Sequence, residues 1–208
     1  MPNLYYYDRE IAVCEKPRGV LSEGTGEGTM PTLLARTLAD AGVRGTVYPV
    51  HRLDRGTEGI MVFALTKEAA AALSAQMADR RATKEYVAEV CGVPSPTEGR
   101  MEDLLYFDRG RNRSYVVTRE RRGVKRAALR YRVLGSENGI SRVAVQLETG
   151  RTHQIRVQFA SRKMPLVGDR AYGAPPSEQP MALRACYLAF DHPRTGERMA
   201  FGESQFPS

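Results

Sequence analysis

The sequence predicts an α+β fold with a mixed, largely antiparallel central sheet flanked by helices. Two observations lead to this prediction: segments typical of strands outnumber those typical of helices, and most strand-like segments follow one another through short turns. Strands joined by short turns pair antiparallel, whereas parallel strands need a longer crossover. The chain shows neither an internal repeat nor a long linker, so we expect residues 1–208 to form a single domain.

The first predicted strand lies near the N-terminus. Residues 11–17 (IAVCEKP) are a short, mostly apolar run closed by a proline and a glycine turn, a pattern that favours a strand. A glycine-rich loop follows at residues 23–30. Because it lacks the G-K-[ST] ending of a phosphate-binding loop, we assign it no nucleotide role.

Two segments of the first half are predicted to be helices. Residues 31–41 begin with Pro31, which suits a first helical position, and Gly42 is the expected stop. Residues 67–81 are rich in alanine, and Thr66 is the expected N-terminal cap. The apolar positions at helical spacing are Leu34, Leu38 and Ala41 in the first helix, and Ala70, Leu73 and Met77 in the second.

Further strands are predicted along the rest of the chain. Residues 59–66 are an apolar run typical of a buried strand, and residues 84–92 alternate in a way that favours a strand with one wetter face. Residues 127–135 and 140–150 are two more strands, joined by turn residues 136–139. The wetter face of 84–92 is expected to carry Glu85, Val87 and Glu89, opposite Tyr86, Ala88 and Val90.

The C-terminal third gives a weaker pattern. Residues 154–162 (QIRVQFASR) are short and leave helix and strand open. Residues 185–201 are predicted to form a hairpin around the turn HPRTG.

Composition is that of a folded protein, with 42% hydrophobic and 26% charged residues. No stretch approaches the ~18 apolar residues of a membrane span, and the N-terminus lacks the pattern of a secretory leader, so we expect a cytoplasmic protein without membrane contact. Three scattered cysteines and three scattered histidines form no recognisable disulfide or zinc pattern, so no metal is expected.

Positive charge is concentrated in one segment. The formal net charge is +7, and residues 109–126 hold eight basic residues against one acidic residue, which equals the whole excess. A local arginine cluster suits a polyanion such as nucleic acid, and a solvated hairpin without a partner is the alternative. The residues of this segment expected to contact such a polyanion are Arg109, Arg111, Arg113, Arg121 and Arg122.

One aspartate stands out within HRLDRGTEG (residues 51–59). Asp54 lies between Arg52 and Arg55, and such a residue alone is usually an exposed ion pair worth ~0–1 kcal/mol. An arginine held near the carboxylate would instead keep it ionised, as a nucleophile requires. An aromatic residue such as Tyr86 could stack on a base that has left its helix.

Seven short motifs together resemble the RluA family of RNA pseudouridine synthases. They are EKPRGV, HRLDRGTEGIMVFA, KEYVAEVCG, the basic segment GRNRSYVVTRERRGVKRAALRYRVL, LETGRTHQIRVQ, PLVGDRAYG and LAFDHPRTGERMAF. They occur in the family's order and cover roughly residues 8–207. The resemblance implies the pseudouridine synthase catalytic fold.

The resemblance also implies residue roles. Asp54 would be the catalytic carboxylate, Tyr86 would pack against the target uracil, and Arg156 would pair with Asp54 and hold it ionised. Arg52 would fill the gap left by the flipped nucleotide. The residues expected to support the site or contact RNA are His51, Arg151, Thr152, His153 and Gln154.

The implied reaction breaks the N1–C1′ bond of a uridine and rejoins the uracil through C5. Nothing is oxidised and no group is lost, so neither a cofactor nor a metal is expected. Whether Asp54 attacks C1′, attacks C6 or acts through a glycal is left open. The expected partner is structured RNA, with ribosomal RNA favoured and transfer RNA possible, and the expected state is a monomer.

Two departures and two alternatives accompany this interpretation. The family commonly has serine where Glu58 lies and histidine where Arg184 lies, which concerns substrate detail more than activity. The chain starts at the catalytic domain, so no N-terminal S4 domain is expected.

The alternatives are a non-catalytic RNA-binding or RNA-chaperone protein of the same fold, and a hydrolase built on Asp54 and His153.

Overall fold

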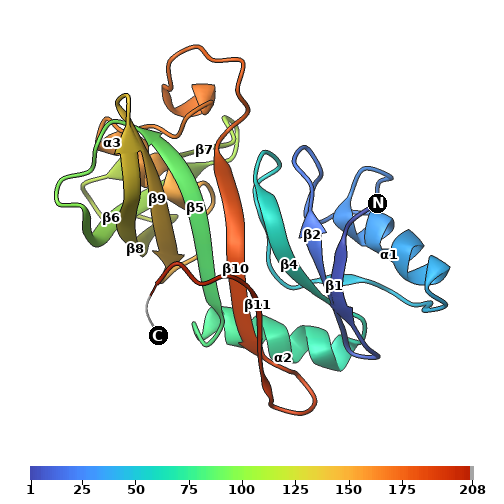
Figure 1. Ribbon diagram of the computed structural model, residues 1–208. Helices are drawn as coiled ribbons and strands as arrows, with labels where there is room; N and C mark the ends of the chain where they lie inside the picture. The colour runs from blue at the N-terminus through green and yellow to red at the C-terminus, as the bar shows by residue number, and fades with distance from the viewer. Residues whose placement is uncertain (207–208) are drawn as a thin grey trace. The chain divides into compact units, whose positions relative to one another are not determined.

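The structure, a computed structural model, describes residues 1–206 and divides into two compact units. Unit 1 contains Met1–Lys84 and Ala185–Ser204, and unit 2 contains Glu85–Arg184 with the residues from Gln205 onward. In both units strands and helices are combined, and the strand pairings described below are antiparallel (Figure 1). The predicted α+β class is confirmed, whereas a single domain over residues 1–208 stays a prediction.

Unit 1 is built on strands in the order β1-β2-β4-β10. Two short strands extend this set: β3 pairs with β4, and β11 pairs with β10. The β1–β2, β2–β4, β3–β4 and β10–β11 pairs are antiparallel. The strands are β1 (Leu4–Tyr7), β2 (Ile11–Lys16), β3 (Tyr48–Pro49), β4 (Glu58–Ala64), β10 (Leu183–Asp191, in this unit from Ala185) and β11 (Arg198–Gly202).

The two predicted helices of unit 1 are confirmed. Helix α1 spans Met30–Asp40 and α2 spans Lys67–Ala78. The hydroxyl of Thr66 accepts a hydrogen bond from the backbone N–H of Ala69 at 3.1 Å, which is the expected cap. The residues that the helices bury are Met30, Leu34 and Leu38 in α1, and Ala69, Leu73 and Gln76 in α2.

The buried faces of both helices differ slightly from the predicted ones. Ala41 is exposed because α1 ends one residue earlier, and Met30 takes its place in the buried row. In α2, Ala70 and Met77 are only partly buried and Gln76 is buried, because its amide bonds to the backbone of Asp191 at 2.7 and 2.8 Å. A buried polar side chain at this position cannot be recognised from apolar spacing.

Unit 2 is built on strands in the order β5-β9-β8-β6-β7, each pair antiparallel. Helix α3 lies against these strands, because Val157 on α3 belongs to one buried cluster with Leu105 and Ala127. A 3₁₀ turn η1 (Arg170–Tyr172) follows. The other elements are β5 (Thr83–Cys91), β6 (Glu98–Asp108), β7 (Arg113–Val117), β8 (Val124–Glu137), β9 (Ile140–Leu147) and α3 (Gln154–Ser161).

The hairpins of the C-terminal half follow the prediction. Strands β8 and β9 are joined at Asn138 and Gly139, which have φ values of 50° and 77° and so suit the turn that two-residue hairpins prefer. Strands β10 and β11 form the expected tail hairpin around residues 192–196. In the segment 154–162, left open by the sequence, Gln154–Ser161 form α3 and Arg162 is its C-cap.

The structure adds strands to those predicted and corrects one predicted face. The sequence predicts no element over β6 and β7, and in the structure β6 is paired with both β7 and β8. Glu85, expected on the wetter face of β5, is 1% exposed. Its carboxylate accepts hydrogen bonds from the backbone N–H of Gln205 at 2.7 Å and the amide of Gln146 at 3.3 Å, which satisfy it inside the fold.

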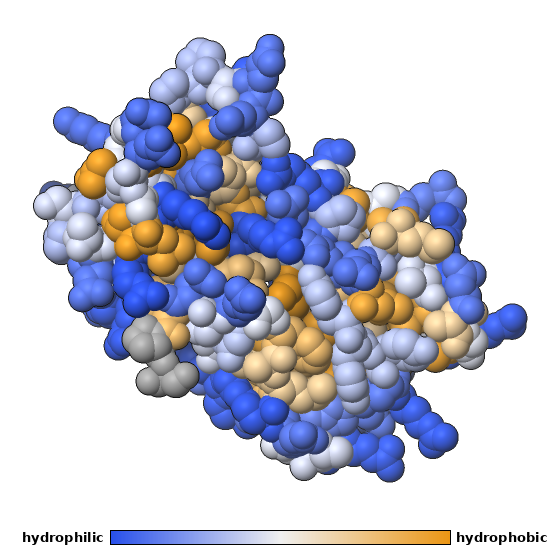
Figure 2. All heavy atoms as spheres, viewed as in Figure 1, coloured by the Kyte–Doolittle hydropathy of each residue, from blue (hydrophilic) through white to orange (hydrophobic). Residues whose placement is uncertain are grey.

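Figure 2 shows hydrophilic side chains over most of the face in view, with apolar patches between them. Within residues 1–206, no helix has the length and apolar character that crossing a bilayer would need.

Candidate active site

The loop that carries Asp54 lies in unit 1, between β3 and β4, and is fixed by its neighbours. The hydroxyl of Ser22 accepts a hydrogen bond from the N–H of Leu53 at 2.9 Å and donates one to the carbonyl of the same residue at 2.7 Å. The N–H of Thr57 donates to the carbonyl of Asp54 at 2.9 Å. The Leu53 side chain is buried, so the backbone beside the carboxylate is anchored on both sides.

A buried lysine supports the same loop from β2. Lys16 is 0% exposed, and its ammonium donates to the carbonyls of Pro17, Val20 and Arg55 at 3.0, 2.8 and 3.4 Å. Burial lowers the pKa of Lys16 to about 8, and the negative charge of Asp54 acts in the opposite direction. The K-P-x-G motif therefore ties the Asp54 loop and brings a positive charge within electrostatic reach of its carboxylate.

The two arginines beside Asp54 are engaged with other groups. Arg52 forms an exposed ion pair with Glu23 at 2.8 Å. Arg55 donates from Nε to the carbonyl of Gly19 at 2.9 Å. Both arginines thus bind elsewhere in unit 1, and the anchored backbone of the loop fixes the position of Asp54.

The departure at Glu58 has a charged counterpart. Glu58 Oε1 lies 3.3 Å from Arg18 Nη2, and both side chains are about one third exposed, at 33% and 29%.

The next residue, Gly59, has φ +126°, and a Cβ there would lie 2.1 Å from the carbonyl oxygen of Ala185 on β10. Glycine is therefore required where β4 and β10 approach each other.

His51 is a neutral, structural ring. Its Nε2 accepts a hydrogen bond from the N–H of Val62 at 3.1 Å. Its Nδ1 is buried, and among residues 1–206 it has no hydrogen-bond partner. Burial lowers the pKa of His51 to about 3, and the charge of Lys84 adds to this effect. A neutral ring that binds the backbone of β4 supports the motif and is unsuited to pairing with an RNA phosphate.

Arg156 lies on α3 in unit 2 and is held by a carboxylate that the sequence motifs did not single out. Its Nε donates to Asp169 Oδ2 at 2.7 Å, and its Nη2 donates to Asp169 Oδ1 at 2.9 Å. The two side chains are 11% and 2% exposed. Such a two-point contact fixes the plane of the guanidinium.

Tyr172 completes this cluster. Its ring centroid lies 4.8 Å from Arg156 Cζ and 4.9 Å from Arg113 Cζ. Its hydroxyl accepts a hydrogen bond from the N–H of Ser114 at 2.8 Å and lies 3.0 Å from Nδ1 of His153. Asp169 and Tyr172 both belong to PLVGDRAYG, so polar residues beside a glycine turn were the signal that could have identified them.

His153 begins α3 in an unusual backbone conformation. It is the N-cap residue and has φ 54° and ψ 25°, a left-handed conformation that costs a non-glycine residue energy. Its ring packs edge-on against Tyr172 with centroids 5.7 Å apart. The Ser114 hydroxyl donates to the carbonyl of Thr152 at 2.5 Å. The T-G-R-x-H-Q motif is thus fastened to β7 and η1.

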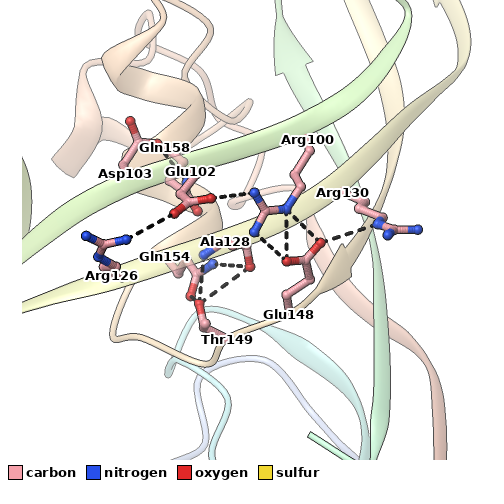
Figure 3. A network of polar contacts seen from close by, with 10 residues as sticks. All are labelled: Arg100, Glu102, Asp103, Arg126, Ala128, Arg130, Glu148, Thr149, Gln154 and Gln158. Atoms are coloured by element: carbon pink, nitrogen blue, oxygen red, sulfur yellow. Dashed lines mark hydrogen bonds and ion pairs between the residues drawn. The ribbon is translucent and has the colours of Figure 1, made fainter.

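Gln154 is buried, and its amide stabilises the turn before α3 (Figure 3). Its Oε1 accepts from the Thr149 hydroxyl at 2.8 Å and from the N–H of Arg151 at 3.0 Å, while its Nε2 donates to the carbonyl of Ala128 at 3.0 Å. Arg151 donates from Nε to the carbonyl of Arg126 at 3.0 Å. These bonds favour a supporting role for Gln154 over a direct RNA contact.

The site residues are distributed over both units. Unit 1 contains Asp54, and unit 2 contains Tyr86 and Arg156. Tyr86 lies on β5 opposite Val145 and is 6% exposed. The pairing of Asp54 with Arg156 and the contact of Tyr86 with a base stay predictions. Among the described residues, no group of three or more His, Cys, Asp or Glu side chains is arranged to hold a metal ion.

The basic side chains of residues 109–126 are mostly exposed, as the sequence predicts, and the segment contains β7, the edge strand of unit 2. Arg113 is the exception, since it is partly buried against Tyr172. Arg121 Cζ lies 4.8 Å from the ring centroid of Tyr106, which is paired across the strands with Tyr115. In the described chain, the cations of this segment without an ion pair include Arg109, Arg119, Arg122 and Lys125.

A network of opposite charges adjoins this segment (Figure 3). Glu148 lies 2.8 Å from Arg100 and 3.3 Å from Arg130, and the hydrogen bond from Arg100 is the main cause that lowers the pKa of Glu148. Arg126 pairs with Glu120 at 3.2 Å. These arginines are neutralised within the fold, so the unpaired cations carry the field available to a polyanion.

Comparison with known proteins gives a consistent result. Residues 10–161 match the family described as RNA pseudouridylate synthase. The chain is 35% identical over 207 residues to the dual-specificity RNA pseudouridine synthase RluA of Escherichia coli (strain K12), covering 95% of this chain and 90% of that protein. It is 36% identical over 207 residues to the uncharacterized RNA pseudouridine synthase YlyB of Bacillus subtilis (strain 168), covering 96% of this chain and 67% of that protein.

Solved structures show the same fold. The human RNA pseudouridylate synthase domain containing 4 superposes with a TM-score of 0.79 at 24% identity, covering 97% of this chain and 88% of that chain. The human RNA pseudouridylate synthase domain containing 1 gives a TM-score of 0.78 at 24% identity, covering 99% and 84%. From the family match and the identity to RluA, the chain belongs to the RNA pseudouridylate synthase family, whose members isomerise uridine in RNA.

Proposed function

We propose that this protein isomerises uridine to pseudouridine in structured RNA and that Asp54 is the carboxylate that acts on the target nucleotide. The observation that carries this assignment is the anchoring of the Asp54 loop by Ser22 and Lys16. Arg52 binds Glu23, and Arg55 binds the carbonyl of Gly19. Ion pairing of Asp54 with these two neighbouring arginines therefore does not explain why the loop is anchored.

The reaction needs little beyond positioning and charge. The N1–C1′ bond breaks, the uracil turns, and a new bond forms from C5 to C1′; the C5 proton leaves and N1 takes up a proton, so the product is an isomer of the substrate. Asp54 is proposed to act as a carboxylate, with the positive charge of Lys16 within electrostatic reach of it, and its pairing with Arg156 is part of the same proposal. Tyr86 is proposed to pack against the uracil after the nucleotide has left its helix, a step that costs a few kcal/mol of unstacking.

RNA binding is assigned to the exposed cations of residues 109–126. Phosphate contacts from these side chains would offset part of the flipping cost and make affinity fall steeply with salt. Arg52 is exposed beside Asp54 and is proposed to fill the gap left by the flipped nucleotide. We assign His51 and Gln154 to support of the site, because their polar atoms bond to the backbone.

The proposed target is ribosomal RNA first and transfer RNA second. One relative is named a dual-specificity RNA pseudouridine synthase, and another, of Zymomonas mobilis, is named a ribosomal large subunit pseudouridine synthase D at 33% identity over 215 residues. Mapping pseudouridine in total RNA from cells with and without the gene identifies the uridine. A monomeric state and a cytoplasmic location stay predictions.

The alternative is a protein of the same fold that binds RNA without modifying it. Incubation with RNA that carries tritium at C5 of uridine separates the two, because only isomerisation exchanges that tritium into water. Catalytic release that continues over many turnovers supports the proposal. Tight binding of the same RNA without release, over a set containing ribosomal and transfer RNA, would favour the alternative.

A further inference from the structure

We propose that Asp169 is a positioning residue for the reaction, holding the Arg156 guanidinium in the one orientation from which it meets the catalytic carboxylate. The inference rests on the proposed function, in which Arg156 pairs with Asp54. It adds a residue from a different part of the chain, the turn before η1, to which no role has been assigned.

The contact between Asp169 and Arg156 has the geometry of a clamp. Both carboxylate oxygens are used, at 2.7 Å to Nε and 2.9 Å to Nη2, so the guanidinium cannot rotate about its long axis without breaking a hydrogen bond. Asp169 takes two of the five N–H donors of the guanidinium. The other three lie on Nη1 and Nη2, the end that can point toward a second carboxylate.

The clamp is itself anchored. The carbonyl of Asp169 accepts hydrogen bonds from the N–H groups of Tyr172 at 3.0 Å and Ala174 at 3.2 Å. Gly168, which precedes it, has φ +76°, and a Cβ there would lie 2.5 Å from the carbonyl oxygen of Gln179. The turn is therefore confined on both sides, so the carboxylate of Asp169 is a fixed reference point for Arg156.

A second group fixes the face of the guanidinium. The Tyr172 ring centroid lies 4.8 Å from Arg156 Cζ, and the hydroxyl of this ring is held by the N–H of Ser114 at 2.8 Å. The guanidinium thus has one edge on Asp169 and one face on Tyr172, which leaves it little freedom. A preorganised cation acts on developing charge without reorganisation during the reaction.

The burial of the pair explains why a carboxylate is needed at residue 169. Asp169 is 2% exposed and Arg156 is 11% exposed in their side chains, so water cannot take the place of either partner. A purely structural salt bridge between α3 and the turn would have the same burial. The two roles differ in what they predict for turnover once the protein is folded.

The test compares two substitutions of the clamp with the wild-type chain. Asp169→Asn keeps the size of the side chain but removes its charge and one acceptor, and Asp169→Glu keeps the charge but lengthens the reach. Both are assayed for kcat and KM by tritium release from C5-labelled uridine RNA over pH 5–9, with the folded fraction measured by circular dichroism. Asp103→Asn, which removes a carboxylate that binds Arg162 at 2.9 Å beside the same helix, is the matched control.

For Asp169→Asn we expect a decrease in kcat of about 10- to 100-fold per folded molecule, because a group misplaced by about 1 Å can cost that much. KM for RNA should change less than threefold, and the acidic limb of the kcat profile should move to higher pH. Asp169→Glu is expected to fold and to show the same decrease in kcat, while Asp103→Asn keeps wild-type kcat.

A double-mutant cycle makes the inference specific. If Asp169 acts only through Arg156, then Asp169→Asn should lower kcat by less than threefold when it is introduced into Arg156→Lys. Wild-type kcat in folded Asp169→Asn would overturn the proposal, and if that variant does not fold, wild-type kcat in Asp169→Glu would overturn it. An inactive Asp54→Asn beside a fully active Asp169 variant would overturn this inference alone and leave the proposed function intact.

Discussion

The N–H of Val62, in the middle of β4, donates a hydrogen bond to Nε2 of His51 at 3.1 Å, and His51 lies three residues before the proposed catalytic carboxylate in the chain. The neutral ring is therefore part of the structure that joins the catalytic loop to the sheet. Because burial lowers the pKa of His51 to about 3, protonating it in the folded state is unfavourable near neutral pH.

This contact predicts a loss of stability in acid. As pH falls below about 6.5, the unfolded chain binds a proton at His51 and the folded chain does not, so the free energy of unfolding should decrease until the folded pKa is reached. The expected decrease due to His51 is about 2 kcal/mol between pH 7.5 and pH 5. Urea unfolding of wild type and His51→Gln at both pH values measures it.

His51→Gln keeps an acceptor for Val62 but has no titrating group, so its stability should depend on pH less than that of wild type by this amount. His153 and His192 are present in both proteins and cancel in the comparison. An equal dependence on pH in the two proteins would contradict the role assigned to His51.

The buried ammonium of Lys16 predicts a second effect. Lys16→Met keeps the length of the side chain but leaves the carbonyls of Pro17 and Val20 without their donor, so we expect the free energy of unfolding to fall by about 1–3 kcal/mol. Turnover per folded molecule should also fall, because the variant has no positive charge at this position near Asp54. Exposed Lys67→Met is the control and should stay within about 0.5 kcal/mol of wild type.

Ser22 predicts a loss of activity without a change in charge. Ser22→Ala removes both hydrogen bonds to Leu53 and leaves a buried N–H and carbonyl unpaired, which should cost about 1–3 kcal/mol of stability. We expect kcat to fall more than the folded fraction does, because the loop that positions Asp54 is loosened. Equal kcat per folded molecule in wild type and Ser22→Ala would show that this anchor does not position the carboxylate. Ser74→Ala, on the exposed face of α2, is the matched control.

The unpaired cations of the basic segment predict a change in salt dependence. Replacing Arg109 and Arg122 by glutamine removes two charges that have no ion pair in the described chain, so RNA affinity should fall. The slope of log K against log salt should decrease by about 0.7–0.9 for each phosphate that the variant no longer binds. Arg44→Gln, an exposed arginine of unit 1, should leave the slope unchanged. An unchanged slope in the double variant would place the RNA elsewhere.

Local signals in the sequence were enough for much of the fold. The Thr66 cap, the Asn138–Gly139 turn and the β10–β11 hairpin are each encoded within a few neighbouring residues. Strand β6 could not be predicted in this way, because its polar sequence is ordered by pairing with β7 and β8. The burial of Glu85 depends on Gln205, which is 120 positions away.

In the candidate site, too, some features are encoded by neighbouring residues and others depend on residues far apart in the sequence. The motifs identified Asp54, Tyr86 and Arg156 as candidates, and the charge count located the basic segment. The groups that hold these residues are distant in sequence: Ser22 lies 31 positions from Leu53, and Asp169 lies 13 positions from Arg156. Such contacts depend on the tertiary fold, so no spacing in the sequence could predict them.

The most direct measurement of the central claim is tritium release from C5-labelled uridine RNA by wild type and Asp54→Asn at equal folded concentration. Asp40→Asn, which changes an exposed aspartate at the end of α1, serves as the control. We predict release by wild type and Asp40→Asn, none above background by Asp54→Asn, and RNA affinity within about threefold in all three proteins. Full release by folded Asp54→Asn would contradict the assignment of Asp54 as the catalytic carboxylate.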